Sequence, residues 1–245
     1  MSESATPRPF DAQHAANYDD RWVPLAPLRD SLHLQMRFIL QSLPADARVL
    51  CVGIGTGAEL LALAAFFPGW RFVAIDPAAP MLEMCRRKAA AAGILDRCEF
   101  HACFVHELPP GEPFDAATAL LVSQFITDRA HRAGFFREVA RRLRPAGWLI
   151  TADLTTAPAG QHESLLGVWQ QMMRHVGASE AQIQALLTSY GRDVALLPAT
   201  AMEALLVEGG FDRPVRFSQS LLINAWYARR FDSGPNRPNL SPPCP

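Results

Sequence analysis

The segment covering residues 49–67 constrains the fold most, because an apolar run turns through several glycines directly into an apolar helix. Residues 49–54 (VLCVGI) have the continuous hydrophobicity of a buried strand, and residues 58–67 (AELLALAAFF) that of a buried helix. Without Cβ atoms the chain can turn sharply and let a ligand approach the free N–H groups of the helix. The segment therefore predicts a strand, a ligand-binding turn and a helix, with the turn built on Gly53, Gly55 and Gly57.

The alternation of strand and helix signals continues along the chain. Strands are predicted at residues 49–54, 71–75, 99–104, 114–122 and 148–154, with helices at 58–67, 79–92 and 132–143. This repetition requires a parallel sheet with helices on both faces. Three further helical segments (163–175, 180–190 and 199–208) precede two strand-like runs, 214–219 and 221–229, whose link is too short for a crossover helix. We predict an α/β, Rossmann-like doubly wound sheet of seven strands, mostly parallel, with one antiparallel strand from a C-terminal hairpin.

The length and composition favour one domain. With 245 residues, 49% of them hydrophobic, the chain is long enough for one large core and short for two. We assign residues 10–231 to this domain, with 10–45 as an N-terminal helical cap and 155–208 as a helical cover. Residues 1–9 and 232–245 are rich in Pro and polar residues, so we expect them to be disordered.

Charge and residue usage argue against several kinds of partner. The 23 Lys and Arg residues nearly balance the 24 Asp and Glu residues, so nothing in the composition favours nucleic acid. The first residues do not look like a signal peptide, and no apolar run reaches the roughly 18 residues of a membrane span, so a cytoplasmic protein is expected. The five cysteines form no C-x-x-C pair and predict reduced thiols, and no histidine pair has ligand spacing, so no metal is expected.

An acid follows the second predicted strand at the place where a nucleotide-binding sheet needs one. Asp76 lies 21 residues beyond Gly55, in the sequence VAIDP. A carboxylate at this strand tip can accept hydrogen bonds from two ribose hydroxyls. The alternative is that the glycines only make a tight turn and Asp76 caps the next helix. Residues 53–58 also fit the G-x-G-x-x-A pattern of nicotinamide dehydrogenases, although the chain is short for a separate substrate domain.

Several motifs together resemble the class I S-adenosylmethionine-dependent methyltransferases. They are the three glycines, the run Val73-Ala74-Ile75-Asp76-Pro77 with Met81, the pair Phe114-Asp115, and Phe135-Phe136-x-x-Val139-x-x-x-Leu143-x-Pro145-x-Gly147. The resemblance covers residues 47–154, and the hairpin at 211–229 matches the reversed last strand of that fold. It implies S-adenosylmethionine as the cofactor and in-line methyl transfer as the reaction.

The resemblance also implies which residues bind the cofactor. Those expected at the cofactor are Gly53, Gly55, Thr56, Gly57, Asp76, Pro77, Met81, Cys103, Phe104 and Leu121. The glycines would border the methionine part and Asp76 the ribose, whereas core packing is an equal alternative for Met81 and Phe104. The chain departs from the family at Cys51 and Cys103, where many relatives carry an acid.

The acceptor is expected just after the fourth strand, under covering elements. The proposed substrate residues are Tyr18, Trp22, Gln124, Phe125, Trp169 and Arg174. His14, Tyr18 and Trp22 have helical spacing and indicate either a lid or a simple docking helix. Trp169 belongs to a Met and Trp stripe that fits either a core or an apolar pocket wall. No catalytic base is assigned, because the need for one depends on the acceptor: acidic protons or free lone pairs require none, whereas hydroxyls generally benefit from one.

A narrower resemblance concerns the donor. Ser123-Gln124-Phe125 and Arg174-x-x-Gly177-x-Ser179-Glu180 are similar to the tRNA wobble-uridine carboxymethyltransferases, which use carboxy-S-adenosylmethionine. In that case Arg174 would hold the extra carboxylate; otherwise it is a solvated residue at a helix end. We favour a small-molecule methyltransferase using ordinary S-adenosylmethionine, with tRNA modification and a non-catalytic cofactor-binding module as alternatives. The edge of the terminal hairpin could support a homodimer.

Overall fold

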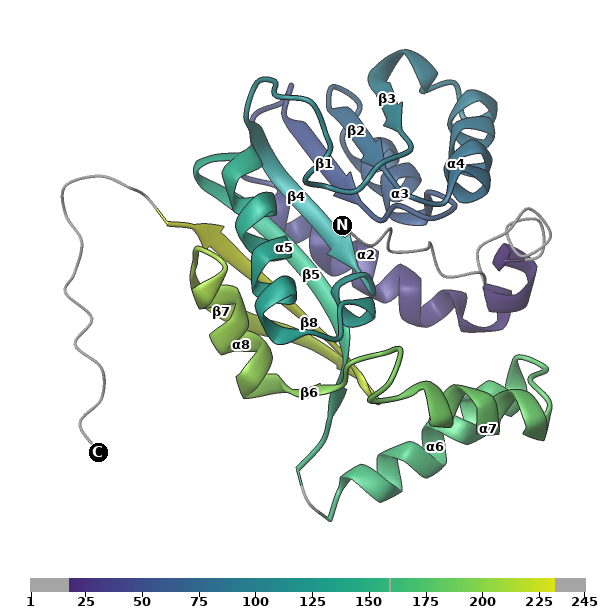
Figure 1. The fold of residues 1–245 in the computed structure, drawn as a ribbon. Coiled ribbons are helices and arrows are strands. Elements are labelled where there is room, and N and C mark those ends of the chain that lie inside the picture. The colour runs from purple at the N-terminus through teal and green to yellow at the C-terminus, as the bar shows by residue number, and fades with distance from the viewer. Residues whose placement is uncertain (1–17, 159, 232–245) are drawn as a thin grey trace, which may run out of the picture.

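The structure is a computed structural model that describes residues 18–158 and 160–231. The disorder predicted for residues 1–9 and 232–245, and the position of His14, lie outside the described residues. Figure 1 shows one twisted sheet with helices on both faces and a separate pair of helices beyond the end of β5. In the described ranges, no helix combines the length and the hydrophobicity that crossing a membrane requires.

The main sheet has seven strands in the order β3-β2-β1-β4-β5-β8-β7. They are β1 (Arg48–Val52), β2 (Arg71–Ile75), β3 (Cys98–His101), β4 (Phe114–Leu120), β5 (Leu143–Thr156), β7 (Phe211–Ser220) and β8 (Ile223–Arg230). Strands β1 to β5 pair in parallel, and β8 runs antiparallel to both β5 and β7. The short β6 (Leu197–Pro198) pairs with the end of β5 outside this order. The predicted sheet, including its one antiparallel strand, is confirmed.

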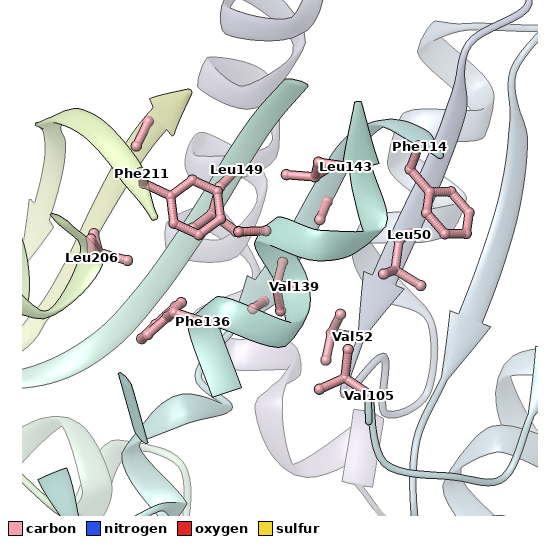
Figure 2. Close-up of a cluster of buried hydrophobic side chains, with 14 of the residues drawn as sticks. Leu50, Val52, Val105, Phe114, Phe136, Val139, Leu143, Leu149, Leu206 and Phe211 are labelled. Atoms are coloured by element: carbon pink, nitrogen blue, oxygen red, sulfur yellow. The ribbon is translucent and has the colours of Figure 1, made fainter. Parts of the chain in front are cut away.

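The two faces of the sheet are covered by different helices. One face packs against α2 (Ala26–Leu40), α3 (Ala58–Phe66) and α4 (Ala79–Ala91), the other against α5 (Arg129–Arg142) and α8 (Ala199–Glu208). Strand β1 shows why both faces need a cover, because Val49 and Cys51 point to the first face while Leu50 and Val52 point to the second. Figure 2 shows side chains of the second core, among them Phe136 and Val139 of α5 and Leu206 of α8.

The region between β3 and β4 lacks a helix, although the fold elsewhere places one after each parallel strand. Residues 102–113 form an irregular loop that fills this space with the buried side chains of Val105 and Leu108. Arg142, the last residue of α5, holds the loop by donating to the carbonyls of Val105 at 3.2 Å, Pro109 at 2.7 Å and Leu108. The strand predicted at 99–104 therefore ends at His101.

The turn before β5 also differs from the sequence prediction. The strand begins at Leu143, which pairs with Phe114, and an irregularity then precedes the regular register from Trp148 onward. The irregularity contains Ala146, whose φ is +55°. The predicted helix therefore ends one residue earlier, at Arg142, and the strand predicted at 148–154 is longer at both ends.

The segment predicted as a helical cover divides into two parts. Helices α6 (His162–His175) and α7 (Glu180–Ser189) pack on each other, and we call this pair the α6–α7 cover. Its apolar side chains form a third, smaller core together with Leu154 of β5, Val194 and Leu222. Helix α8 instead packs against α5 and β7 as part of the main domain. At the edge of the sheet, β7 contains Pro214 and two register shifts, between Asp212 and Val215 and between Arg216 and Ser218.

Candidate cofactor and acceptor site

The glycine turn, residues 53–57, is a tight structure in which all three glycines have positive φ. Gly53 has φ +62° and Gly57 φ +92°. A Cβ on Gly53 would lie 2.5 Å from Val122 Cγ2, and one on Gly57 would lie 2.5 Å from Cys85 Sγ. These two glycines are therefore required by the packing of the turn against the end of β4 and against α4.

Gly55 is different, because the described part of the chain leaves space beside it. Its φ is +56°, and a Cβ added to it would meet one atom of the described chain within 4 Å besides its own neighbours, Met81 Cε at 3.6 Å. A side chain here would project into room that the described chain leaves open. Glycine is therefore favoured at this position for two reasons: its backbone has positive φ, and a ligand can approach where a side chain would otherwise lie.

Asp76 is fixed directly beside this opening. Its Oδ2 accepts a hydrogen bond from the Gly55 N–H at 2.8 Å, and its Oδ1 accepts one from the Ala78 N–H at 2.8 Å. Burial raises the pKa of the carboxyl, while the two N–H donors oppose that shift. Each carboxylate oxygen has a further lone pair. The sequence left two roles open for Asp76, helix capping and ribose binding. One carboxylate can fill both, because capping uses only one lone pair of each oxygen.

The N-terminal segment lies over the turn. Residues 18–22 are helical, and Tyr18 packs against Ala78 and Met81. Thr56 Oγ1 donates a hydrogen bond to Asp19 Oδ1 at 2.7 Å, and Asp19 also forms an ion pair with Lys88 of α4. Burial raises the pKa of Tyr18, as do the nearby carboxyl groups of Glu59, Asp19 and Asp76. Tyr18 therefore lies beside the start of α4 and near the carboxylate of Asp76.

The residues expected near the adenine are spread along the same edge of the sheet. Met81 is buried on α4, and Pro77 is half-buried beside Asp76. Cys103 is half-buried and packs against the second core, and burial raises the pKa of its thiol. Phe104 is 37% exposed and stacks on His106. Of these, Met81 lies nearest the turn, with its Cε 3.6 Å from where a Cβ on Gly55 would be, while Cys103 and Phe104 follow β3.

The turn after β4 is held by a buried polar network that the sequence analysis missed. Ser123 Oγ donates to Asp153 Oδ2 at 2.8 Å, and the Gln124 N–H donates to Asp153 Oδ1 at 2.8 Å. Arg132 of α5 donates from Nε to Ser123 Oγ at 2.8 Å. Burial raises the pKa of Asp153 to about 6. In the sequence, the one sign of this network is Asp153, a charged residue near the end of the otherwise apolar strand 148–154.

The residues around this network have different environments. Leu121, with φ +59°, is 36% exposed at the end of β4. Gln124 is buried, and its Oε1 accepts from the Leu154 N–H at 2.9 Å. Phe125 is 43% exposed. The Gln124 side chain is thus engaged in holding β5, while Leu121 and Phe125 present surface beside the turn.

An apolar cavity of about 340 Å³ lies where the N-terminal segment meets the α6–α7 cover. It is lined by Arg21, Trp22, Met173, Ala178, Gln182, Ile183, Ala185 and Leu186. Trp169 lies in the core of the cover, 6% exposed, and donates from Nε1 to the Tyr190 hydroxyl at 2.9 Å. Arg174 is exposed and forms a two-point ion pair with Glu180. Among the predicted substrate residues, Trp22 is the one that lines this cavity.

Three comparisons with known proteins bear on this arrangement. Residues 49–147 match a methyltransferase domain family. A demethylmenaquinone methyltransferase from Thermus thermophilus is 30% identical over 170 residues, which are 68% of this chain and 75% of that protein. The chain belongs to the class I S-adenosylmethionine-dependent methyltransferases.

Solved structures of low sequence identity share the methyltransferase fold. A putative O-methyltransferase from Nostoc punctiforme superposes with a TM-score of 0.67 at 15% identity, over 93% of this chain and 62% of the other. This methyltransferase thus spans less than two thirds of the length of the Nostoc protein. A methyltransferase from Methanosarcina mazei superposes with a TM-score of 0.59 at 17% identity, over 80% of this chain and 98% of the other.

In this methyltransferase Cys51 stands where many relatives carry an acid, and a buried acid that no sequence motif indicated, Glu59, lies close to it. Cys51 is fully buried, and burial raises the pKa of its thiol well above the usual value, so the end of β1 carries no charge. Glu59 of α3 is also buried, and its Oε1 accepts from Thr118 Oγ1 at 3.5 Å. In residues 18–158 and 160–231, no group of three or more His, Cys, Asp or Glu side chains is placed to hold a metal ion.

Proposed function

We propose that the protein transfers a methyl group from S-adenosylmethionine to a small apolar acceptor. The fit of the cofactor rests on two features of the glycine turn. The opening beside Gly55 leaves room for the methionine part, and the carboxylate of Asp76 has lone pairs for the ribose hydroxyls. When bound, S-adenosylmethionine supplies an electrophilic methyl group on a sulfonium.

The observation that carries the acceptor proposal is the position of Trp22. The Tyr18 and Trp22 rings lie 6.3 Å apart between their centroids, with Tyr18 against Met81 at the turn and Trp22 lining the apolar cavity. One short helical segment therefore reaches from the start of α4 to a cavity of about 340 Å³. Such a volume and lining suit a small, mostly apolar molecule. The Thermus relative is named as a demethylmenaquinone methyltransferase.

Ordinary S-adenosylmethionine is the donor that the surroundings of Arg174 favour. The extra carboxylate of carboxy-S-adenosylmethionine would need a cation when removed from water. Arg174 is engaged with Glu180 at the surface, Nη2 to Oε2 at 3.0 Å, and both side chains are exposed. This pairing supports a solvated helix end rather than a carboxylate-binding arginine.

In this proposal the protein contributes alignment and exclusion of water. Methyl transfer from a sulfonium is an in-line displacement with a good leaving group, so the reacting atoms mainly need fixed positions. The network of Ser123, Arg132 and Asp153 fixes the turn after β4, where the acceptor would meet the methyl group. The segment of Tyr18 and Trp22 would close the cleft.

The test is product formation from S-adenosylmethionine carrying a trideuterated methyl group. Purified protein is incubated with this donor and with separate small-molecule and RNA fractions of a cell extract, and products are identified by mass spectrometry. A labelled small molecule that fails to form with Asp76→Ala would support the proposal. Label found only in RNA would overturn the acceptor class, and cofactor binding without any labelled product would indicate a non-catalytic module.

A further inference from the structure

Glu59 is a buried acid in the first turn of α3, directly after the glycine turn. The residue is 7% exposed, and its side chain points toward the sheet rather than to solvent. Thr118, which donates to it at 3.5 Å, is paired in register with Cys51 on the neighbouring strand. Glu59 therefore lies beside the end of β1, where the chain has Cys51 in place of an acid.

The surroundings of Glu59 contain acids and thiols but no cation bonded to it among the described residues. The groups that face it are Cys51 of β1, Asp76 at the end of β2, Cys85 of α4 and Tyr18 of the N-terminal segment. The nearby Lys88 is already paired with Asp19. Across the part of the chain that the structure describes, none of the ion pairs includes Glu59.

A buried carboxyl without a cation is more stable in its neutral form. Burial raises the pKa of Glu59 to about 8, against the opposing effect of hydrogen bonds from its own backbone N–H and from Thr118. The negative charge of Asp76 raises the pKa further. Without cofactor, Glu59 is therefore mostly protonated at neutral pH.

We infer that Glu59 binds the ammonium group of the cofactor's methionine part, in place of the acid missing at Cys51. This inference rests on the proposed binding of S-adenosylmethionine. Two observations support it. Glu59 is the second residue after Gly57, and its carboxyl lies against Thr118, the register partner of Cys51. It is also near enough to Tyr18 and Asp76 for its charge to raise the pKa of Tyr18 and for the charge of Asp76 to raise its own pKa. Asp76 already accepts two backbone hydrogen bonds and is positioned for the ribose.

Binding of the cofactor's ammonium group by Glu59 would release one proton, and this release can be measured. Before binding, Glu59 is a neutral carboxylic acid and the ligand carries an ammonium group. Binding forms a carboxylate–ammonium pair, and the carboxyl proton is released to the buffer. The ligand's amino group stays protonated between pH 6 and 7, below the usual pKa of an α-amino group. Cofactor affinity should therefore rise with pH over this interval.

The experiment is titration calorimetry of the whole chain with S-adenosylhomocysteine, in buffers of different ionisation enthalpy. For the natural sequence we expect release of between about 0.5 and one proton per ligand at pH 7, and roughly five- to tenfold tighter binding at pH 7 than at pH 6. The matched ligand 5′-methylthioadenosine lacks the amino-acid part, so it should bind without releasing that proton. Equal proton release with both ligands would overturn the inference.

Two variants assign the proton to Glu59. Glu59→Gln keeps the shape of the protonated side chain, and it should lose both the proton release and the pH dependence while binding 5′-methylthioadenosine normally. Glu163→Gln, an exposed change in the first turn of α6, should behave like the natural sequence. If Glu59→Gln binds S-adenosylhomocysteine as tightly and with the same proton release, the inference is wrong.

The outcomes also separate this inference from the proposed function. If neither ligand binds the natural sequence, the cofactor assignment itself fails. If S-adenosylhomocysteine binds without proton release, the cofactor assignment stands and only the role of Glu59 fails. Circular dichroism melting checks the fold of Glu59→Gln, and if that variant is unfolded, the contrast between the two ligands on the natural sequence decides.

Discussion

Arg132 Nη2 lies 3.2 Å from Asp153 Oδ1 in an ion pair whose side chains are 1% and 0% exposed. The pair joins α5 to the carboxyl end of β5, and Ser123 of the turn after β4 is hydrogen-bonded to both residues. Removing two charges from water is costly, so such a pair adds little to stability by itself. The pair instead holds the turn after β4 in place, and the acceptor is proposed to bind beside this turn.

Breaking this pair should destabilise the protein strongly. Asp153→Asn leaves the Arg132 guanidinium buried without its counter-ion, and we expect a loss of about 3 to 5 kcal/mol in the free energy of unfolding. Urea denaturation monitored by circular dichroism measures it. Glu180→Gln, which breaks the exposed pair with Arg174, is the control and should change stability little. Equal stabilities for the two variants would contradict a structural role for the buried pair.

Asp76→Ala should weaken cofactor binding. The variant loses the carboxylate proposed to accept the ribose hydrogen bonds, and we expect a loss of on the order of 2 to 4 kcal/mol in the binding free energy of S-adenosylhomocysteine. Calorimetric titration measures this, with Asp46→Ala, which removes an exposed carboxylate, as the control. Because Asp76 also accepts from the Gly55 and Ala78 N–H groups, melting is recorded as well. Unchanged affinity would refute the ribose assignment.

Gly55→Ala should separate ligand access from backbone strain. Gly55 and Gly93 have φ of +56° and +68°, so a methyl group should cost each variant a similar strain of about 1 to 2 kcal/mol in stability. A Cβ on Gly93 would meet no atom of the described chain within 4 Å besides its own neighbours. Only Gly55→Ala should lose cofactor affinity in a binding titration. If both variants bind alike, the opening beside Gly55 is not the ligand site.

His33 should contribute to acid unfolding. Burial lowers its pKa from 6.5 to about 4, with a further lowering by Arg29, so the folded protein keeps the ring neutral. Its stabilising contribution is complete above pH 6.5 and is lost as the pH falls to about 4, by roughly 2 to 3 kcal/mol. His33→Gln should flatten the decline of unfolding free energy between pH 7 and 4.5, whereas the exposed change His175→Gln should not. Parallel declines in all three proteins would exclude this role.

The sequence was sufficient for the sheet and for the conformation of the glycine turn, because both depend on local patterns. The apolar run at β1, the positive-φ glycines after it and Asp76 at the tip of β2 each follow from residues close together in the chain. The resemblance to class I methyltransferases is confirmed by the Thermus relative and the shared fold. The roles given to individual site residues stay predictions.

The missed features depend on contacts between distant residues. The pairing of Arg132 with Asp153 and the approach of Glu59 to Thr118 join residues 21 and 59 positions apart, which periodicity does not encode. The bonds from Arg142 of α5 to the carbonyls of the loop at 102–113 also join residues far apart in the chain. Trp169 had two interpretations, and its burial with a hydrogen bond to Tyr190 favours the core of the cover.

The irregular edge of β7 affects how copies of this protein could assemble. Pro214 supplies no N–H, and the two register shifts bend the strand, so the outer edge offers a broken row of hydrogen-bonding groups. A second sheet cannot extend this one in regular register. A homodimer formed at the hairpin would thus have to join through side chains, and the same irregularity protects the protein against open-ended strand association.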